Sequence, residues 1–369
     1  MPKRLRIGVV GCGLVAQVMH LHYLRELPDL YEIAALCDVS QPLREACARD
    51  YAVPYTTGDW RDLLAQNLDA VFILTSGSHA PIAIAAAGAG LHLLIEKPMC
   101  FSIAEGQAMI DAASRARVTL MVAYNKRYDP AYRRFAEDAR ALADLRLVRI
   151  TTLEAPFLPY VTHYRLHRGG PPSPAQQAAF AADNAARIAA AIGEVDPLSA
   201  HAYHLVLLDS LVHEFNAVRG VLGEPDQLTF VDITDTGLTA VLRFGATQCV
   251  LNWVDLPGIA RYAMEFAFYA PQLRLTLSFP SPFLRSAPTM ISREGGDPAT
   301  ARSWQTEEIT GYEESFREEL LHFHACVTSG SAPITSATDA LHDIALCQSV
   351  ITVYRDRVAR DRPSEWTQA

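Results

Sequence analysis

With 369 residues, the chain is long enough for two domains that each bury a hydrophobic core. Half of its residues are hydrophobic and a fifth are charged, as in ordinary globular proteins. The formal net charge of −9 argues against nucleic acid or an anionic membrane as the main partner. No apolar run reaches the roughly 20 residues of a membrane-spanning helix.

The amino terminus leads directly into a predicted strand and shows no signal-peptide pattern, so we expect a cytoplasmic protein. The seven cysteines are scattered, and no two of them have CxxC spacing. They are typical of reduced, mostly buried thiols rather than of a disulfide framework.

The first 125 residues alternate between strand-like and helix-like segments. Strands are expected at residues 5–10, 33–37, 69–75, 92–95 and 119–123, and helices at 14–26, 41–50, 59–66, 81–89 and 103–116. Nearly continuous apolar strands separated by helices predict an α/β domain of the Rossmann type, a doubly wound parallel sheet covered on both faces.

After residue 125 the pattern changes. Helices are expected at residues 129–143, 205–221, 314–327 and 340–357, and strands at 147–153, 228–233, 239–244, 248–253, 264–269 and 273–279. Strand follows strand from residue 227 to about 310, which predicts a large, mostly antiparallel open sheet in a second α/β domain. The apolar stripe of the last helix predicts that it packs back near the first domain.

An alanine-rich segment at residues 171–192 interrupts the second domain. Ser173 and Pro174 form a helix start signal, and Gly193 is a plausible C-cap. The segment is either a surface excursion or a lid or oligomer arm over the site, and the sequence leaves both open.

A nucleotide-binding loop follows the first strand. Gly11 permits a tight turn, and Gly13 lets the backbone approach a pyrophosphate. Leu14 and Val15 then open a helix whose free N–H groups face the phosphates, and Ala16 stands where a third glycine is common. A chance match is the alternative, but the strand–loop–helix context favours a dinucleotide site.

Asp38 ends the second strand, where a carboxylate can accept hydrogen bonds from both adenosine ribose hydroxyls. It would repel a 2′-phosphate, and Val39 follows with no arginine beside it. The sequence therefore predicts NAD as the cofactor in preference to NADP.

Lys97 lies in the tripeptide Glu96-Lys97-Pro98, directly after an apolar strand. The carboxyl ends of parallel strands are where such sheets bind ligands. A surface Glu–Lys pair is the alternative for this tripeptide alone. Because the strand belongs to the predicted parallel sheet, we expect Lys97 to face the cofactor crevice.

Asp209 and His213 are four residues apart in an apolar helical pattern, so we expect them on one helix face. A carboxylate and an imidazole held together can orient a substrate alcohol and accept its proton. An exposed ion pair is the alternative for this motif alone.

Taken together, the loop, Asp38, Glu96-Lys97-Pro98 and Asp209-x-x-x-His213 resemble the Gfo/Idh/MocA oxidoreductases, the glucose–fructose oxidoreductase and inositol dehydrogenase family. The stretch from Tyr124 to Pro130 and the final helices add to the resemblance, which covers nearly the whole chain.

The resemblance implies hydride transfer between a nicotinamide and a secondary alcohol or ketone carbon of a sugar, cyclitol or glycoside. It also implies a homo-oligomer, a dimer or tetramer, formed through the large sheet. His213 would be the acid or base, and Lys97 would bind near the reacting hydroxyl and the nicotinamide. Asp209 would bind substrate and support the lysine or the histidine. The implied cofactor contacts beyond the loop are Thr75, Ser76, His79, Glu96, Lys97 and Asn125, and the Lys97–Pro98 bond would be cis.

The chain departs from the family pattern between residues 154 and 204, where it is longer than usual. We therefore expect a rebuilt substrate pocket. His201 and His204 could join His213 at a metal, but no carboxylate or cysteine completes a recognisable spacing, so no metal is predicted.

These observations predict a Rossmann domain at residues 1–125, a substrate-binding and oligomerisation domain at 126–335 with an insert at 154–204, and a returning helix at 336–369. A protein that keeps NAD bound and oxidises a glycoside transiently, for elimination, hydrolysis or epimerisation, is one alternative. A non-enzymatic sugar sensor of the same fold is another, although Lys97 and His213 are both present.

Overall fold

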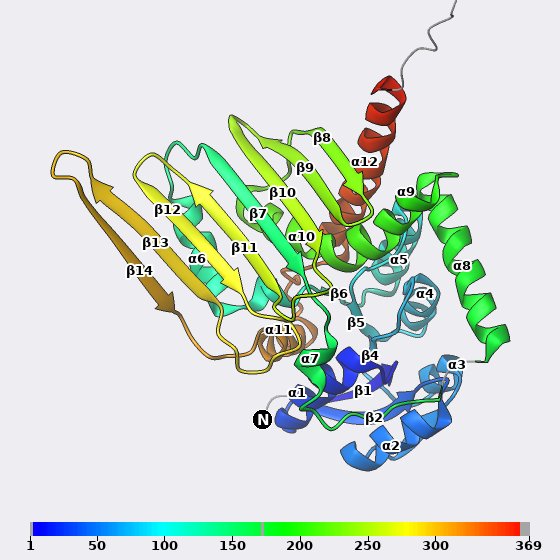
Figure 1. Ribbon diagram of the computed structural model, residues 1–369. Helices are drawn as coiled ribbons and strands as arrows, with labels where there is room; N and C mark the ends of the chain where they lie inside the picture. The colour runs from blue at the N-terminus through cyan, green and yellow to red at the C-terminus, as the bar shows by residue number, and fades with distance from the viewer. Residues whose placement is uncertain (1–2, 171–172, 362–369) are drawn as a thin grey trace, which may run out of the picture.

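The computed structural model describes residues 3–170 and 173–361 and contains two β-sheets (Figure 1). The first sheet, as described, has six strands in the order β3-β2-β1-β4-β5-β6, all parallel to their neighbours. The strands are β1 Leu5–Val10, β2 Tyr31–Cys37, β3 Tyr55–Thr57, β4 Ala70–Ile73, β5 His92–Glu96 and β6 Leu120–Ala123. The predicted Rossmann sheet is confirmed, although the three-residue β3 was too short to be predicted.

Helices connect these strands, as the apolar periodicity predicted. They are α1 Leu21–Glu26, α2 Gln41–Tyr51, α3 Trp60–Leu64, α4 Ala80–Gly88 and α5 Ile103–Ala116. A π-helical segment, η1 (Ala16–His20), directly precedes α1 and continues into it. Because helices flank the sheet, the side chains of β1, β4 and β5 are almost all buried.

The second sheet, in the same described residues, has eight strands in the order β14-β13-β12-β11-β7-β10-β9-β8. Neighbours are antiparallel except for β7 and β10, so the predicted mostly antiparallel open sheet is confirmed. The strands are β7 Leu147–Glu154, β8 Gln227–Thr234, β9 Gly237–Phe244, β10 Thr247–Asp255, β11 Ala263–Tyr269, β12 Leu273–Phe279, β13 Met290–Asp297 and β14 Arg302–Ile309.

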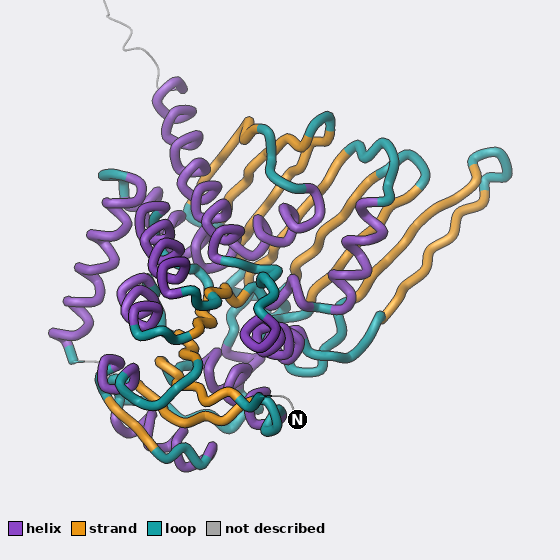
Figure 2. The backbone as a smooth tube through the Cα atoms, turned by 180° about the vertical axis from the view of Figure 1, so that it is seen from behind, coloured by secondary structure: helices purple, strands orange, loops and turns teal. Residues whose placement is uncertain are grey.

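Helices cover one face of this sheet and leave the other face open (Figures 1 and 2). The covering helices include α6 (Pro130–Arg140), α10 (Val212–Leu222) and α12 (Ala337–Asp361), whereas α11 (Ser315–Ser329) packs against α1 and η1 of the first domain. Along β10, residues alternate between buried and half-buried, which is the pattern of a sheet with one face in the core.

The last helix contacts both α5, which flanks the first sheet, and β8 of the second sheet. Arg357 donates from Nε to the carbonyl of Val231 in β8 at 2.8 Å. A β-carbon at Gly106 in α5 would lie 2.5 Å from the side chain of Leu341, so α5 and α12 approach closely because this position is glycine. Helix α12 therefore joins the two sheets.

The insert forms three helices in its described part, α7 (Leu158–Val161), α8 (Pro174–Ile192) and α9 (Pro197–His201). The predicted start of α8 is confirmed, because Ser173 and Gln176 cap each other's backbone N–H groups. The predicted end at Gly193 is confirmed as well. Helix α8 lies to the side of the first sheet (Figure 1).

All seven cysteines lie within the described residues, and each is a buried free thiol, as predicted. Across residues 3–170 and 173–361, none of the helices has the length and apolar character needed to cross a membrane.

Candidate active site

A cleft of about 530 Å³ lies between the loops at the carboxyl edge of the first sheet and the second sheet. Its size suits a small-molecule ligand. Val15 of the nucleotide-binding loop, Lys97, Asp209 and His213 all line it. The remaining walls are formed by Lys126, Glu154, Ala155, Pro156, Phe157, Tyr160, Ser210, Asp255, Pro257, Tyr262, Met264, Ser281, Pro282 and Phe283.

Lys97 reaches across the cleft from the end of β5 to the second domain. Its Nζ donates to the backbone carbonyl of Asp209 at 2.6 Å and to Asp209 Oδ1 at 3.0 Å. Burial disfavours the charge on Lys97, but Asp209 and Glu96 outweigh this and raise the pKa of the ammonium. Lys97 in turn lowers the pKa of the Asp209 carboxyl. The Lys97–Pro98 bond is cis, as the family resemblance implied.

Asp209 and His213 are not on one regular α-helix, which corrects the geometry expected from their spacing. Asp209 lies in a π-helical segment, η3 (Ala202–Leu211), and His213 lies in the first turn of α10. The wider π-helical turns shift side chains from the positions that 3.6 residues per turn would give. Both residues nevertheless line the cleft.

The His213 imidazole is enclosed by protein. Its ring packs edge-on against Tyr124 at 5.9 Å, and its Nδ1 is buried without a partner among the described residues. Burial, followed by the charges of Lys126 and Lys97, holds the pKa of His213 well below its usual value. The imidazole is therefore neutral near pH 7 and can accept a proton.

Two charged residues that the sequence analysis did not place in the site, Lys126 and Glu214, lie close enough to influence its other charges: Lys126 acts on His213, and Glu214 acts on Lys97 and Lys126. Lys126 is 5% exposed, and burial lowers its pKa to about 8, with Lys97 adding to the effect. Glu214 is fully buried and accepts a hydrogen bond from Thr152 Oγ1. Burial raises the pKa of Glu214 to about 7, against the influence of Lys126.

Two sequence signals could have identified these residues. Lys126 lies just beyond β6, at the same sheet edge as Lys97, so the rule used for Lys97 applies to it. Glu214 is a carboxylate among the apolar residues of α10, which is rare unless it has a partner. The cleft residue Glu154 ends β7 and gives no comparable signal; burial raises its pKa.

The loop after β1 has the geometry that a dinucleotide requires. Gly11 has φ +100°, and a β-carbon there would lie 2.8 Å from the backbone carbonyl of Leu74. A β-carbon on Gly13 would meet no atom within 4 Å, so open space adjoins the loop. The residues present therefore fit a pyrophosphate that approaches the backbone closely.

Asp38 holds this loop in place. Its Oδ2 accepts from the backbone N–H of Cys12 at 2.9 Å, and its Oδ1 accepts from that of Ser40 at 2.8 Å. No arginine stands beside Val39 in the sequence, but Arg44 Nη1 donates to the Asp38 carbonyl at 3.1 Å. The first turn of α2 brings Arg44 back, which adjacency in the sequence did not show.

The loop after β4 contains Thr75 and Ser76, which are half-buried and exposed, respectively. His79 is fully buried, and its two ring nitrogens lie 2.8 Å from the carbonyls of Thr75 and Pro98. Its side chain thus joins this loop to the Glu-Lys-Pro turn rather than lining the open crevice.

Glu96 and Asn125 are also engaged within the protein. Glu96 Oε1 lies 2.7 Å from His20 Nε2, and Oε2 accepts from the Lys97 N–H at 3.1 Å. Asn125 Nδ2 donates to Ser315 Oγ at 2.9 Å, and Asn125 lines a small cavity next to the cleft rather than the cleft itself.

The insert crosses the edge of the nucleotide-binding region at two places. His167 exchanges backbone hydrogen bonds with the Gln17 side chain in η1, at 2.8 and 3.1 Å. A β-carbon at Gly77, next to Ser76, would lie 3.3 Å from the Phe180 ring of α8. The insert is therefore in contact with the loops after β1 and β4.

Metal binding has no support from side-chain geometry in residues 3–170 and 173–361. No three histidine, cysteine, aspartate or glutamate side chains there are grouped so that they could hold an ion.

Comparison with known proteins adds independent evidence. Residues 5–124 match the family model GFO_IDH_MocA, described as an oxidoreductase family with an NAD-binding Rossmann fold. D-xylose 1-dehydrogenase (NADP(+)) 2 from Haloferax volcanii is 31% identical over 269 residues, covering 70% of this chain and 71% of that protein. Myo-inositol 2-dehydrogenase from Thermotoga maritima is 23% identical over 354 residues, covering 91% and 92%.

Among solved structures, KijD10 from Actinomadura kijaniata, a 3-ketoreductase in complex with NADP and TDP-benzene, has the same fold. Its TM-score is 0.71 at 18% identity, and the match covers 95% of this chain and 98% of that one.

Proposed function

This chain belongs to the Gfo/Idh/MocA oxidoreductase family, and we propose that it interconverts a secondary alcohol and a ketone on a sugar, cyclitol or glycoside. The observation that carries the proposal is the Lys97–Asp209 bond, which spans the cleft that also contains His213. When bound, the nicotinamide supplies the hydride acceptor or donor.

In the oxidation direction, neutral His213 takes the hydroxyl proton of the substrate. The Lys97 ammonium, held by both the carbonyl and the carboxylate of Asp209, stabilises the negative charge that develops on the substrate oxygen. Asp209, whose side chain is 68% exposed toward the cleft, retains acceptor capacity for a second substrate hydroxyl.

We propose NAD as the cofactor, bound by Gly11, Gly13, Leu14 and Val15 at the pyrophosphate and by Asp38 at the adenosine ribose. The Asp38 carboxylate would repel a 2′-phosphate, whereas the nearby Arg44 guanidinium would attract one. Because Arg44 already donates to a backbone carbonyl, we propose that the charge of the Asp38 carboxylate decides between NAD and NADP.

The remaining cofactor assignments are proposals of the same kind. Glu96 would meet the nicotinamide ribose through the lone pairs left by His20 and the Lys97 N–H, with Asn125 nearby. Thr75 and Ser76 would lie along the cofactor, and His79 would act by fixing their loop.

A second candidate is an enzyme that retains NAD and oxidises a glycoside transiently. The contacts of the insert with Gln17 and Gly77 favour it, because the insert adjoins the nucleotide-binding loops on two sides. Release of nucleotide on denaturation of the purified protein, with no net reduced nicotinamide during turnover, would distinguish it.

We also propose the domain division at residues 1–125, 126–335 and 336–369, with residues 154–204 as the insert. The open face of the second sheet (Figure 1) is the surface we propose for a homo-oligomer. Cytoplasmic location remains a proposal from the sequence.

The test is a screen for reduced-nicotinamide fluorescence with NAD and NADP over sugars, cyclitols and glycosides, including D-xylose and myo-inositol. Saturable reduction of NAD by one of these classes supports the proposal. The proposal would be contradicted if no compound led to reduction of NAD or NADP or to oxidation of the reduced cofactors, and if the purified protein held no nucleotide.

A further inference from the structure

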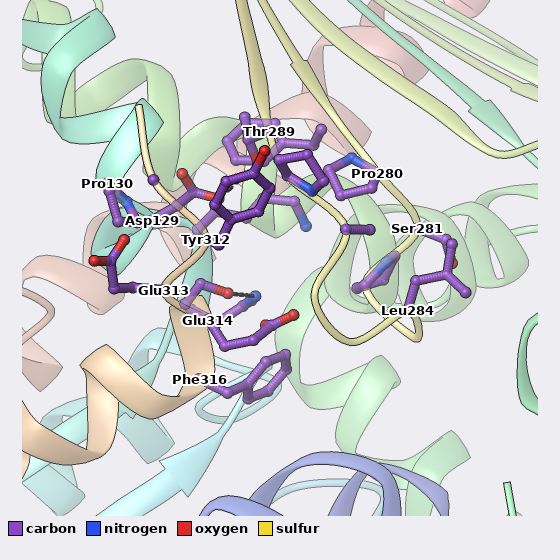
Figure 3. Close-up of a pocket in the computed structure, with 18 residues that line it drawn as sticks. Asp129, Pro130, Pro280, Ser281, Leu284, Thr289, Tyr312, Glu313, Glu314 and Phe316 are labelled. Atoms are coloured by element: carbon purple, nitrogen blue, oxygen red, sulfur yellow. Dashed lines mark hydrogen bonds between the residues drawn. The ribbon is translucent and has the colours of Figure 1, made fainter. Parts of the chain in front are cut away.

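We propose that Lys126 and Glu314 form a proton route that leads from the catalytic cleft to the protein surface. The inference rests on the proposed function, because oxidation of an alcohol leaves one proton that must depart. The route uses a second cavity, next to the cleft, for which the mechanism above has no role (Figure 3).

The second cavity is small and lies between the 280–289 loop and the segment before α11. Its volume of about 40 Å³ is room for roughly three waters. Polar groups from several elements converge on it, including Asn125, Asp129, Thr289 and Glu314. In Figure 3, Asp129, Thr289 and Glu314 come from separate segments around one space.

Lys126 connects the cleft to this cavity, because its side chain lines both. It is 95% buried, being 5% exposed, yet within residues 3–170 and 173–361 its ammonium has no hydrogen-bond or ion-pair partner. The Phe279 ring lies 5.9 Å from its Nζ, and the hydrogen-bonding capacity of this largely buried ammonium is left for water or a ligand.

Glu314 connects the cavity to the outside. It lines the small cavity and also a surface hollow with His22, Arg285 and Arg317. One carboxylate oxygen accepts from the Ser286 N–H at 2.6 Å, which fixes the side chain at the boundary between the two spaces. Lys126 is thus shared by the cleft and the small cavity, and Glu314 by the small cavity and the surface hollow, so polar groups follow one another from the cleft to the surface.

The surroundings of His213 explain why such a route is needed. Burial, Lys126 and Lys97 all disfavour imidazolium, so a proton accepted from the substrate must move on. Among the charges that lower the pKa of His213, Lys126 has the largest effect, and both residues line the cleft.

The charges around Lys126 and Glu314 are suited to proton exchange near neutral pH. Glu214, Glu154 and Asp129 favour the charged form of Lys126, whereas burial and Lys97 disfavour it, leaving its pKa at about 8. Burial and Asp129 raise the pKa of Glu314 to about 7, and Arg285 opposes them. Tyr23 also lies near Glu314.

The transfer balances without a further reactant. The substrate O–H bond breaks and its proton passes to His213. The Lys126 ammonium gives one proton to the cavity water and then, as the neutral amine, takes the proton from His213, which restores the ammonium. A proton leaves Glu314 for solvent as another reaches it through the cavity, so each group returns to its starting state.

The main variant is Glu314→Gln, because Glu314 does not line the cleft and so does not touch substrate. The matched control is Glu307→Gln, an exposed carboxylate at the end of β14 that lines neither the small cavity nor the surface hollow. With D-xylose or myo-inositol in weak buffer, Glu314→Gln should keep its first-turnover nicotinamide reduction. Its steady-state kcat and proton release, followed with an indicator dye, should fall about tenfold or more.

Added imidazole buffer should restore kcat in Glu314→Gln without changing KM, and Glu307→Gln should behave as wild type. The acid limb of kcat near pH 7 should disappear in the variant. Wild-type kcat and proton release in Glu314→Gln, or a loss that no buffer restores, would overturn the route.

A crystal structure of the wild-type protein provides a test that does not depend on catalysis or on the folding of a variant. It should show ordered water linking Lys126 Nζ to the Glu314 carboxylate, and a cavity without that water would overturn the inference. Failure of all substrates in the screen would count against the proposed function instead.

Discussion

The two sides of the cleft are assembled in different ways. On the cofactor side, Gly11, Gly13 and Asp38 belong to one strand–helix–strand unit, and Asp38 bonds directly to the loop. On the substrate side, Lys97 meets Asp209 from a position 112 residues earlier in the chain. Local sequence therefore determines the proposed nucleotide site, whereas the proposed catalytic site depends on how the elements of the two sheets pack together. Substitutions on the substrate side that abolish turnover should therefore leave the affinity for the cofactor largely unchanged.

The largest effect is expected for His213→Gln and Lys97→Met. Loss of the base should lower kcat by about 10²- to 10⁴-fold, and loss of the ammonium by about 10²- to 10³-fold. The dissociation constant for NAD, measured by calorimetry, should remain near wild type. Wild-type turnover in both variants would remove these residues from the mechanism, and a parallel loss of NAD affinity would show that the two sides are not separable.

A second prediction concerns the packing that holds the substrate side together. Arg219 of α10 is 3% exposed at its side chain and pairs with the fully buried Asp343 of α12 at 2.6 Å. Arg219→Met leaves that buried carboxylate without its cation, although the hydrogen bond from Asn216 Nδ2 at 2.8 Å remains, and it also removes the pairs of Arg219 with Glu224 and Asp339. The free energy of unfolding should therefore fall by about 3–5 kcal/mol.

The matched control is Arg274→Met, which removes an exposed pair with Glu294 on the second sheet and should cost less than about 1 kcal/mol. Denaturant melts of both variants measure the difference. Equal decreases in the free energy of unfolding in both variants would show that the Arg219–Asp343 pair between α10 and α12 stabilises the protein no more than an exposed pair does.

The same contrast explains what the sequence could predict. The Rossmann sheet followed from apolar runs, and the loop followed from glycines whose backbone requirements are local. The π-helical turn before His213 could not be predicted, because the spacing of apolar residues does not reveal a wider turn.

The partners of individual groups were also beyond the sequence. The first turn of α2 brings Arg44 to the Asp38 carbonyl. Glu314 lines the same small cavity as Lys126, although the two residues are far apart in the sequence. Such meetings depend on tertiary packing, in which neither residue type nor spacing identifies the partner.

A third prediction sharpens the cofactor side. Asp38→Ala should weaken NAD binding by about 1.5–3 kcal/mol and reduce discrimination against NADP, since charge-assisted hydrogen bonds and repulsion are both lost. Asp38→Asn is the control that keeps the side-chain shape without the charge. Binding titrations with both nucleotides measure this, and an unchanged NAD affinity in the alanine variant would exclude Asp38 from the site.

The smallest effect is expected from the insert. Phe180 is 48% exposed and lies against Gly77, so Phe180→Ala removes part of one apolar contact with the loop after β4. The rate of NAD release should rise by about fivefold, equivalent to about 1 kcal/mol. Phe230→Ala changes a similarly exposed ring on β8 and should not alter the rate of NAD release. If NAD is released at the same rate from both variants, the insert does not control cofactor exchange.

The most direct test of the account is a crystal structure of Lys97→Met with NAD and a sugar or cyclitol substrate trapped in the cleft. The account predicts that the reacting hydroxyl lies between the His213 imidazole and the position of the lost ammonium, with its carbon facing C4 of the nicotinamide. A nicotinamide ring directed away from these residues would contradict it.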